Sequence, residues 1–427
     1  MQKNEAKIGA FPNSPAGKSD RPPATIANVK HVMEHVGITI RYNLVKKRDE
    51  IIIPNWNGCP DNVDNATVNY IISLVAEHHM PTNNVSGFLE TIANQNAYNP
   101  VADWIRSEKW DGQNRLPELY ASVIEHPDTS VEFKELLLHK WLLSITAANI
   151  LASGFRARGI LTFQGPQSIG KTTWFRQLIS DEELSRSVIK LGFHLDPSDK
   201  DSVLGAITNA VVELGELDSS FARGMARLKG FTTEDFDRVR RPYGKRESEY
   251  PRRTIFGASV NDANFLLDPT GNSRFWVIPV IGFVYPHRID MQQLFAQLLA
   301  ELEGKLAIGA DHIWWLNPDE ELELALRNGQ HRAVSAMDEK LGDRLDLSLI
   351  GSDANPRMTA TDVAEWLGYK PATSAQVREA GASLRQMLGE PSRSKGRVRW
   401  AVPMSPVDSA TWVRYGKSIY EGPGDDT

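Results

Sequence analysis

Residues 165–173 read Gly-Pro-Gln-Ser-Ile-Gly-Lys-Thr-Thr, and this stretch decides the fold. It matches the phosphate-loop pattern G-x-x-x-x-G-K-[ST]. In such a loop the backbone N–H groups turn inward around phosphate oxygens, the lysine reaches the β- and γ-phosphates, and the hydroxyl ligates Mg²⁺. The sequence therefore predicts a nucleotide site made of Gly165, Pro166, Gln167, Ser168, Ile169, Gly170, Lys171, Thr172 and Thr173.

The flanks of this loop fit the same interpretation. Residues 159–164 are a short apolar run of strand-forming residues, and residues 173–179 carry apolar side chains at helical spacing. A strand, a glycine loop and a helix in this order aim the start of the helix at bound phosphates. We therefore expect an α/β phosphate-loop core.

The composition of the whole chain sets limits on its class. The 427 residues are 41% apolar and 24% charged, which is typical of a soluble globular protein of about three domains. No run of about 18 apolar residues and no signal-peptide core is present, so we expect an intracellular, cytoplasmic protein without a membrane span. The single cysteine, Cys59, excludes an internal disulfide, and no Cys/His cluster has zinc spacing. The net charge of −6 does not indicate nucleic-acid binding, which local basic patches must decide.

Local composition divides the chain into six segments. Residues 1–24 are rich in Pro, Gly, Ser and Lys and are expected to form a disordered tail. The predicted order after it is a mostly helical domain at 25–129, the ATPase core at 130–285, a helical extension at 286–351, a winged helix at 352–403 and a tail at 404–427.

Individual elements can be predicted within these segments. Helices are expected at 26–36, 66–80, 84–94, 130–153 and 374–388, and one from Pro100 to a stop at Gly112. A short strand is expected at 48–54. Residues 358–368 read as a short capped helix that ends at glycine, and 389–402 alternate basic and apolar residues as a β-wing does.

Acidic residues follow the next buried strand. The apolar run 210–212 is followed by Glu213 and Glu216. Nucleotide hydrolysis requires one acid near Mg²⁺ and a group that orients the attacking water. The usual pattern has two adjacent acids with Asp first, so the sequence leaves open which of the two glutamates holds the metal. We expect Thr172 and Glu213 at the metal.

Two further residues complete the predicted catalytic set. Asn261 ends the apolar run that starts at Ile255, where an amide can bind both the attacking water and a γ-phosphate oxygen. Arg274 follows a Gly-Asn-Ser turn, and a guanidinium on a rigid turn can stabilise charge on a transferred phosphate. The predicted catalytic residues are Lys171, Glu213, Glu216, Asn261 and Arg274.

Basic residues cluster in two places that could contact DNA. The first, between the acids and Asn261, has a net charge of +5 over residues 238–253. Such contacts to phosphates bind without sequence choice. The alternative that the last two arginines face nucleotide at a subunit interface stays open. The candidates are Lys229, Arg238, Arg240, Arg241, Lys245, Arg246, Arg252 and Arg253.

The second cluster lies in the predicted winged helix, whose helix and wing could hold duplex DNA. Its wing reads Arg393-Ser-Lys-Gly-Arg-Val-Arg-Trp400. Many winged helices contact only protein, and this alternative is also open. The candidates here are Arg393, Lys395 and Arg397.

Several motifs in this order resemble the virulence-associated protein E family, which consists of phage and genomic-island ATPases similar to superfamily 3 helicases. They are Glu213-Leu-Gly-Glu216, Arg241-Pro-Tyr-Gly244, Pro251-Arg-Arg253, Asp268–Trp276, Asn99-Pro-Val and Trp110–Leu116. Val260 departs from the family pattern, in which a hydroxyl residue usually precedes the asparagine.

This resemblance implies an AAA+-like, superfamily 3 helicase-like core. It also implies a homohexameric ring that uses ATP and Mg²⁺ and acts on DNA, one strand of which threads the ring, in replication of a phage or mobile element. By position, Glu213 matches the Walker B acid, Asn261 the sensor and Arg274 an arginine finger that acts across subunits.

Two other function classes compete with a ring helicase. A phosphate-loop kinase would need an acceptor pocket and a lid, and no segment is obviously built for either. A regulatory or helicase-loading ATPase would share the loop without unwinding DNA. Residues 1–130 show no primase-like acidic cluster, so priming is expected from a separate chain.

Overall fold

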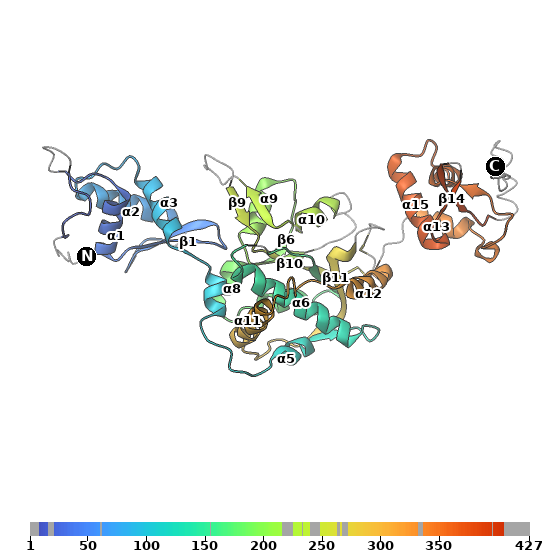
Figure 1. The fold of residues 1–427 in the computed structure, drawn as a ribbon, viewed down its shortest axis with the longest axis horizontal. Helices are drawn as coiled ribbons and strands as arrows, with labels where there is room; N and C mark the ends of the chain where they lie inside the picture. The colour runs from blue at the N-terminus through green and yellow to red at the C-terminus, as the bar shows by residue number, and fades with distance from the viewer. Residues whose placement is uncertain are drawn as a thin grey trace. The chain divides into compact units, whose positions relative to one another are not determined.

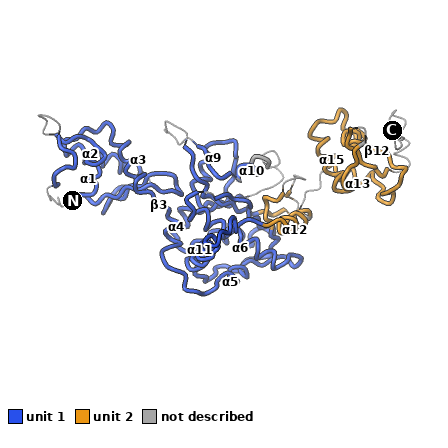
Figure 2. Tube along the Cα trace, in the orientation of Figure 1, with its two compact units in different colours: residues 1–216, 227–259, 278–316 blue, residues 217–226, 260–277, 317–427 orange. Residues whose placement is uncertain are grey.

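The structure is a computed structural model. It describes residues 8–15, 21–59, 62–153, 155–215, 225–232, 234–239, 248–262, 265–266, 272–331, 336–394 and 396–404. The chain forms two compact units (Figure 2). The first comprises residues 1–216, 227–259 and 278–316, and the second comprises residues 217–226, 260–277 and 317–427. No helix in the described ranges is both long and apolar enough to cross a membrane.

The N-terminal part of the first unit packs three helices on a small sheet. The helices are α1 (Ile26–Val36), α2 (Val63–Glu77) and α3 (Val85–Gln95). The strands β1 (Thr39–Asn43), β2 (Arg48–Ile52) and β3 (Ala97–Tyr98) form a sheet of order β2-β1-β3, in which β1 and β2 are antiparallel. The predicted helices and the predicted strand are confirmed, and the sheet adds strands to a segment that the sequence indicates to be mostly helical.

Part of the segment predicted to be disordered has defined contacts. Ile8 and Phe11 pack against the core of this region. The Asn13 backbone N–H donates to Asn28 Oδ1 at 2.8 Å, and Asn28 is fully buried in α1. Because these contacts satisfy a buried polar side chain, the disorder prediction is wrong for residues 8–15.

A six-stranded sheet, most of whose residues belong to the first unit, has the order β4-β11-β5-β10-β7-β6. β7 pairs in parallel with β6 and β10, and β4 is antiparallel to β11. The central strands are buried on both faces, which explains their continuous apolar sequences. The bounds are β4 Val123–Glu125, β5 Ile160–Gln164, β6 Ile189–Phe193, β7 Val211–Gly215, β10 Ile255–Val260 and β11 Phe275–Phe283.

Helices cover this sheet (Figure 1). The longest, α6 (Val131–Ile150), is buried over most of its length, and its Trp141 Nε1 donates to Phe256 O of β10 at 2.8 Å. α6 packs against α11 (Met291–Ala307). The remaining bounds are α4 Pro100–Ile105, α5 Leu116–Ala121, α7 Lys171–Arg176, α8 Glu182–Val188, α9 Lys200–Ile207 and α10 Met225–Thr232.

Two predicted features differ here. The core does not begin at residue 130, because β4 already belongs to its sheet and α4 and α5 already pack on α6. The helix predicted to run from Pro100 to Gly112 ends at Ile105. After this end, side chains of α11 bind backbone groups of Glu108, Lys109 and Asp111, which hold the segment in a non-helical path.

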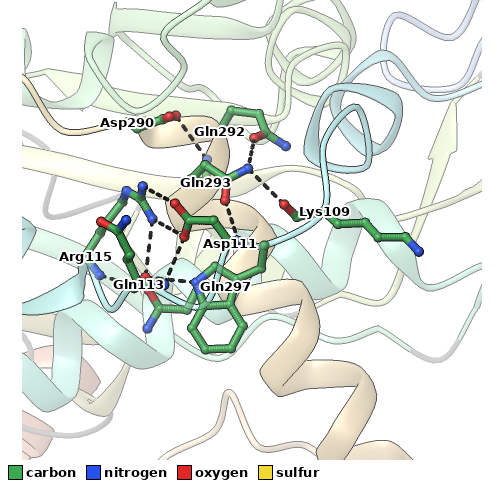
Figure 3. A network of polar contacts seen from close by, with 9 residues as sticks. Lys109, Asp111, Gln113, Arg115, Asp290, Gln292, Gln293 and Gln297 are labelled. Carbon is green, nitrogen blue, oxygen red and sulfur yellow. Dashed lines mark hydrogen bonds and ion pairs between the residues drawn. The ribbon is translucent and has the colours of Figure 1, made fainter.

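Figure 3 shows this attachment. Gln293 Oε1 accepts from the Asp111 N–H at 2.8 Å, and Gln297 Oε1 accepts from the Arg115 N–H at 3.0 Å. Gln292 Nε2 donates to Ile105 O and Glu108 O, each at 3.0 Å. The segment is closed on itself by Arg115, whose two terminal nitrogens each lie 2.7 Å from an Asp111 oxygen. The 110–116 motif therefore fastens a loop to α11.

The C-terminal part of the second unit has its own core. α13 (Ala336–Arg344), α14 (Ala360–Trp366) and α15 (Ser374–Leu388) pack on a sheet of order β12-β14-β13. Those strands are Arg357–Met358, Arg397–Ala401 and Ser392–Ser394, and β13 and β14 form an antiparallel hairpin. The predicted helices and hairpin are confirmed.

The predicted boundary at residue 352 is wrong. Met337, Leu341 and Leu345 belong to the same buried cluster as Trp400 and Val402, so α13 is part of this C-terminal core. A second helix, α12 (Pro318–Asn328), precedes it in the same unit.

Candidate functional site

The glycine loop joins β5 to α7, as predicted. Ser168 and Gly170 have positive φ angles of 67° and 107°, which turn the backbone within the loop. Neither end of the loop has room for a side chain, because a Cβ on Gly165 would overlap the Val280 carbonyl and one on Gly170 would overlap the Tyr285 ring. These close approaches and the left-handed backbone explain both glycines of the motif.

Lys171 is held inside the loop. Its Nζ donates to Gly165 O and to Pro166 O, each at 2.7 Å, and the side chain is buried. Burial lowers the pKa of Lys171, and the nearby Glu213 carboxylate acts in the opposite direction. The ammonium therefore binds neutral carbonyl oxygens of the loop. Charged oxygens of a bound anion could replace these carbonyls as its hydrogen-bond acceptors.

Glu213, one of the two predicted acids, lies near this lysine. It lies on β7, which β10 separates from β5, and its side chain is almost completely buried. The Gly192 N–H donates to its Oε2 at 2.6 Å, and the Thr172 hydroxyl donates to its Oε1 at 3.4 Å. A buried carboxylate is costly unless donors reach it, and here a backbone amide and a hydroxyl do so.

Thr172 and Glu213 are suited to a divalent cation. Both present oxygen atoms, the ligands that Mg²⁺ prefers, and they lie side by side. Within the described ranges no group of three or more acidic, histidine or cysteine side chains could hold a metal. Mg²⁺ usually keeps several waters and binds through one or two protein ligands plus substrate phosphates, so two protein oxygens fit this ion.

The remaining predicted catalytic residues are placed as follows. Asn261 is the first residue after β10 and is exposed. Arg274 ends a short 3₁₀ turn, Asn272–Arg274, and is half-buried. Both belong to the second compact unit, whereas Lys171, Thr172 and Glu213 come together in the first. Glu216 lies outside the described residues.

The turn that carries Arg274 is fastened by a residue that sequence reasoning missed. Asn328, at the end of α12, is almost fully buried and its Nδ2 donates to Asn272 O at 2.9 Å and to Phe275 O at 2.8 Å. Both ends of the turn are therefore fixed by one amide. An asparagine at a helix end carries no sequence signal for this, because it usually serves as a cap or turn residue.

The first basic cluster is only partly described. β8 (Phe236–Val239) and β9 (Ser248–Pro251) form an antiparallel ribbon. Arg238 on β8 is exposed, and its Nε lies 2.8 Å from Glu249 Oε2 across the ribbon. Arg240, Arg241, Lys245 and Arg246 lie outside the described residues, as does the side chain of Lys229.

The prediction that Arg252 contacts DNA is wrong. Its Nη2 lies 2.6 Å from Asp237 Oδ1, and both side chains are fully buried. The same nitrogen donates to Phe231 O at 3.0 Å, and the guanidinium carbon lies 4.5 Å from the centre of the Phe231 ring. A side chain enclosed by a carboxylate and an aromatic ring cannot reach a phosphate.

Arg253 is buried as well, and the same correction applies. Its Nη1 donates to Ala148 O at 3.2 Å and Leu151 O at 3.4 Å, the carbonyls at the end of α6. Burial lowers the pKa of Arg253. Cations favourably bind the last carbonyls of a helix, so this arginine caps α6. The alternative of a nucleotide contact at an interface is excluded for both arginines by their burial.

Lys47, at the end of the β1–β2 turn, completes this buried cationic region. It is 2% exposed, and its Nζ donates to Ile207 O at the end of α9 at 2.7 Å. Burial lowers the pKa of Lys47 to about 8, opposed by Asp237 and reinforced by Arg252 and Arg253.

The second basic cluster is exposed. Arg393 on β13 and Arg397 on β14 lie on the hairpin surface, and Lys395 between them lies outside the described residues. A groove of about 600 Å³ runs between the start of α14, one face of α15 and β14. Its lining includes Thr359, Arg378, Arg385, Arg397 and Trp400. Three arginines on one groove suit a polyanion.

Comparison with known proteins identifies one family. The model of the virulence-associated protein E-like domain matches residues 105–333, from the end of α4 to a point shortly after α12. No curated protein matches the sequence.

Solved structures of the NrS-1 C-terminal region are distantly similar. The apo structure of residues 305–718 of that protein has a TM-score of 0.41 and 14% identity over 88% of this chain and 98% of that chain. A further apo form has a TM-score of 0.35 and 15% identity over 88% and 99%. At this level the likeness carries no information about chemistry.

Proposed function

This chain belongs to the virulence-associated protein E-like family, and we propose that it is an ATP-dependent ring DNA helicase or translocase that serves replication of a phage or mobile genetic element. One observation carries the proposal. The lysine and threonine of a glycine loop lie against a buried glutamate on another strand of the same sheet. Loop cation, hydroxyl and acid are the parts of a nucleotide-hydrolysing site that hold the phosphates and the metal.

The proposed fold is a phosphate-loop core of AAA+-like, superfamily 3 helicase-like type. Its support is the strand–loop–helix unit β5–α7 and the position of the acid-bearing β7 two strands away. The C-terminal core, with two capped helices followed by a hairpin, supports a winged helix.

We assign the chemistry as follows. Lys171 binds the β- and γ-phosphates of ATP by exchanging loop carbonyls for phosphate oxygens. Thr172 and Glu213 would hold Mg²⁺, which neutralises charge on those phosphates when bound. Glu216, the second acid, and Asn261 would together orient the attacking water. Either glutamate could be the metal-binding one, but the bond from Thr172 favours Glu213.

Arg274 is proposed to complete the site of an adjacent copy of the chain. Its turn is fixed by Asn328, and a preorganised guanidinium stabilises a transition state better than a mobile one. A finger supplied by a neighbour makes hydrolysis depend on assembly, here a homohexamer.

DNA is the proposed partner, and the cytoplasm of a bacterial host the proposed location. One strand would pass through the ring beside Arg238 and the basic residues that follow it. Duplex DNA would contact the exposed hairpin around Arg393 and Arg397. Both clusters would contact phosphates, so binding should weaken steeply with salt and vary little with sequence.

The test is a titration of the full chain with single-stranded DNA while steady-state ATP hydrolysis is followed. A motor turns over faster as DNA binds, whereas a small-molecule kinase is indifferent to DNA. A hydrolysis rate that stays flat up to saturating DNA would contradict the proposal. A strand-displacement assay on forked DNA then separates a helicase from an ATPase that only loads another helicase or regulates replication.

A further inference from the structure

The segment that follows β11 runs along the glycine loop. β11 neighbours β5 in the sheet, and its Val280 carbonyl occupies the place where Gly165 would carry a Cβ. Five residues later in each of these two segments, the Tyr285 ring occupies the place where Gly170 would carry a Cβ. The ring edge therefore lies directly against the residue that precedes Lys171.

The other side of this ring is accessible to solvent. Tyr285 is 46% exposed although it touches the loop. Val284, the residue before it in the chain, is 51% exposed. The edge strand β4 pairs with β11, and the Val284 N–H extends this pairing to Ser122 O at 2.8 Å, which holds the backbone next to Tyr285. A solvent-exposed aromatic ring therefore lies beside the loop.

We propose that Tyr285 is the platform on which the base of the bound nucleotide stacks, an inference that rests on the proposed function. A nucleotide held by its phosphates in the loop must place its ribose and base outside it. A base has two apolar faces, and its burial against an aromatic ring is favourable whatever its hydrogen-bonding edge. The exposed face of the Tyr285 ring supplies such a surface at the loop, and Gly170 leaves the ring room to lie there.

The proposal separates two parts of nucleotide affinity. Lys171 and the loop bind the triphosphate, and Tyr285 binds the base. Inorganic tripolyphosphate carries only the first part, so it is the probe that isolates the loop. Stacking on an aromatic ring tolerates every base, which predicts that ATP, GTP and CTP differ less from one another than any of them differs from tripolyphosphate.

The experiment is calorimetric titration of the full chain with MgATP and with magnesium tripolyphosphate, for the wild type, Tyr285→Ala and Tyr285→Phe. We expect Tyr285→Ala to weaken ATP binding about tenfold, or 1.4 kcal/mol at 25 °C, and to leave tripolyphosphate binding within about twofold. Tyr285→Phe keeps the ring and should bind ATP nearly as the wild type does. Val284→Ala, which removes an exposed aliphatic neighbour, is the matched control.

The outcomes are distinct. If the wild type binds neither ligand, the proposed function fails and this inference fails with it. If the wild type binds both and Tyr285→Ala binds ATP unchanged, the inference alone is overturned. A loss of tripolyphosphate binding in Tyr285→Ala overturns it too, because the ring then only supports the loop. A changed sedimentation mass with unchanged ATP affinity would instead assign Tyr285 to contact between copies of the chain.

Discussion

Two buried cations of the first unit, Lys171 and Arg252, both stand in segments for which the sequence predicts contacts to phosphates. Their surroundings in the structure differ. Lys171 follows a glycine loop, and its ammonium donates to two backbone carbonyls of that loop, with Glu213 nearby. Arg252 follows a basic ribbon, and its guanidinium is enclosed by Asp237 and the Phe231 ring. The first cation can exchange neutral partners for a ligand, whereas the second has a carboxylate partner and no path to solvent.

The comparison teaches what a basic residue in a motif can mean. When both side chains of an ion pair are buried, removing one of them lowers the free energy of unfolding strongly, because the other charge stays buried without a partner. A cation that is bound by loop carbonyls, beside the positive-φ residues Ser168 and Gly170, can bind an anion that enters the loop. Arg274 and Lys47 are intermediate cases, and both can be tested.

We expect Arg274, like Lys171, to act in ATP hydrolysis. Its replacement should have the largest effect of the substitutions compared here. Arg274→Ala removes the guanidinium but keeps the turn, which Asn328 binds through backbone carbonyls. We expect ATP hydrolysis to fall by about 10³ or more while ATP affinity stays within a few-fold. Steady-state kinetics and equilibrium ATP binding measure the two quantities. An equal loss of binding would place Arg274 with the structural cations.

Arg252 should act on stability alone. Arg252→Met leaves the Asp237 carboxylate buried without its ion-pair partner, and we expect a loss of about 3–5 kcal/mol in the free energy of unfolding. The matched control is Arg238→Met on the same ribbon, where an exposed pair contributes at most about 1 kcal/mol.

Urea titrations measure stability, and fluorescence anisotropy with labelled single-stranded DNA measures affinity. Arg238→Met should weaken DNA binding and lower the free energy of unfolding by at most about 1 kcal/mol. If Arg252→Met were as stable as the wild type but bound DNA more weakly, the assignment of Arg252 to a structural role would be contradicted.

Lys47 should reveal its burial through pH. Its pKa is about 8 in the folded chain and 10.5 in the unfolded chain, so between these values the unfolded state binds more protons. Stability therefore rises with pH in this window, and the cost of burying the charge, about 3 kcal/mol, is fully present below pH 8. The difference in unfolding free energy between the wild type and Lys47→Met should grow in favour of the wild type from pH 8 to 10.5. A constant difference would contradict the buried charge.

Local chemistry explains how much of this could be predicted from the sequence. The loop, the strand before it and α15 were predicted because glycines, apolar runs and capping residues act over a few neighbouring positions. Glu213 was found from its place after a buried strand. The C-terminal hairpin followed from alternation of basic and apolar residues.

Other features depend on contacts between distant segments, which no local pattern encodes. Arg252 and Arg253 stand in a basic run, and only the fold places Asp237 and the end of α6 beside them. The Gly192 N–H that binds Glu213 is a backbone group and leaves no trace in residue type. The sequence alone does not place α13 in the C-terminal core, because an amphipathic helix does not specify which surface covers its apolar face.

The most direct test of the central claim is the steady-state rate of MgATP hydrolysis by the full chain and by Lys171→Ala, with single-stranded DNA present. The geometry of the loop predicts that the variant falls to the background rate while its thermal unfolding midpoint stays close to that of the wild type. Hydrolysis by Lys171→Ala at the wild-type rate would contradict the assignment of this loop as the catalytic site.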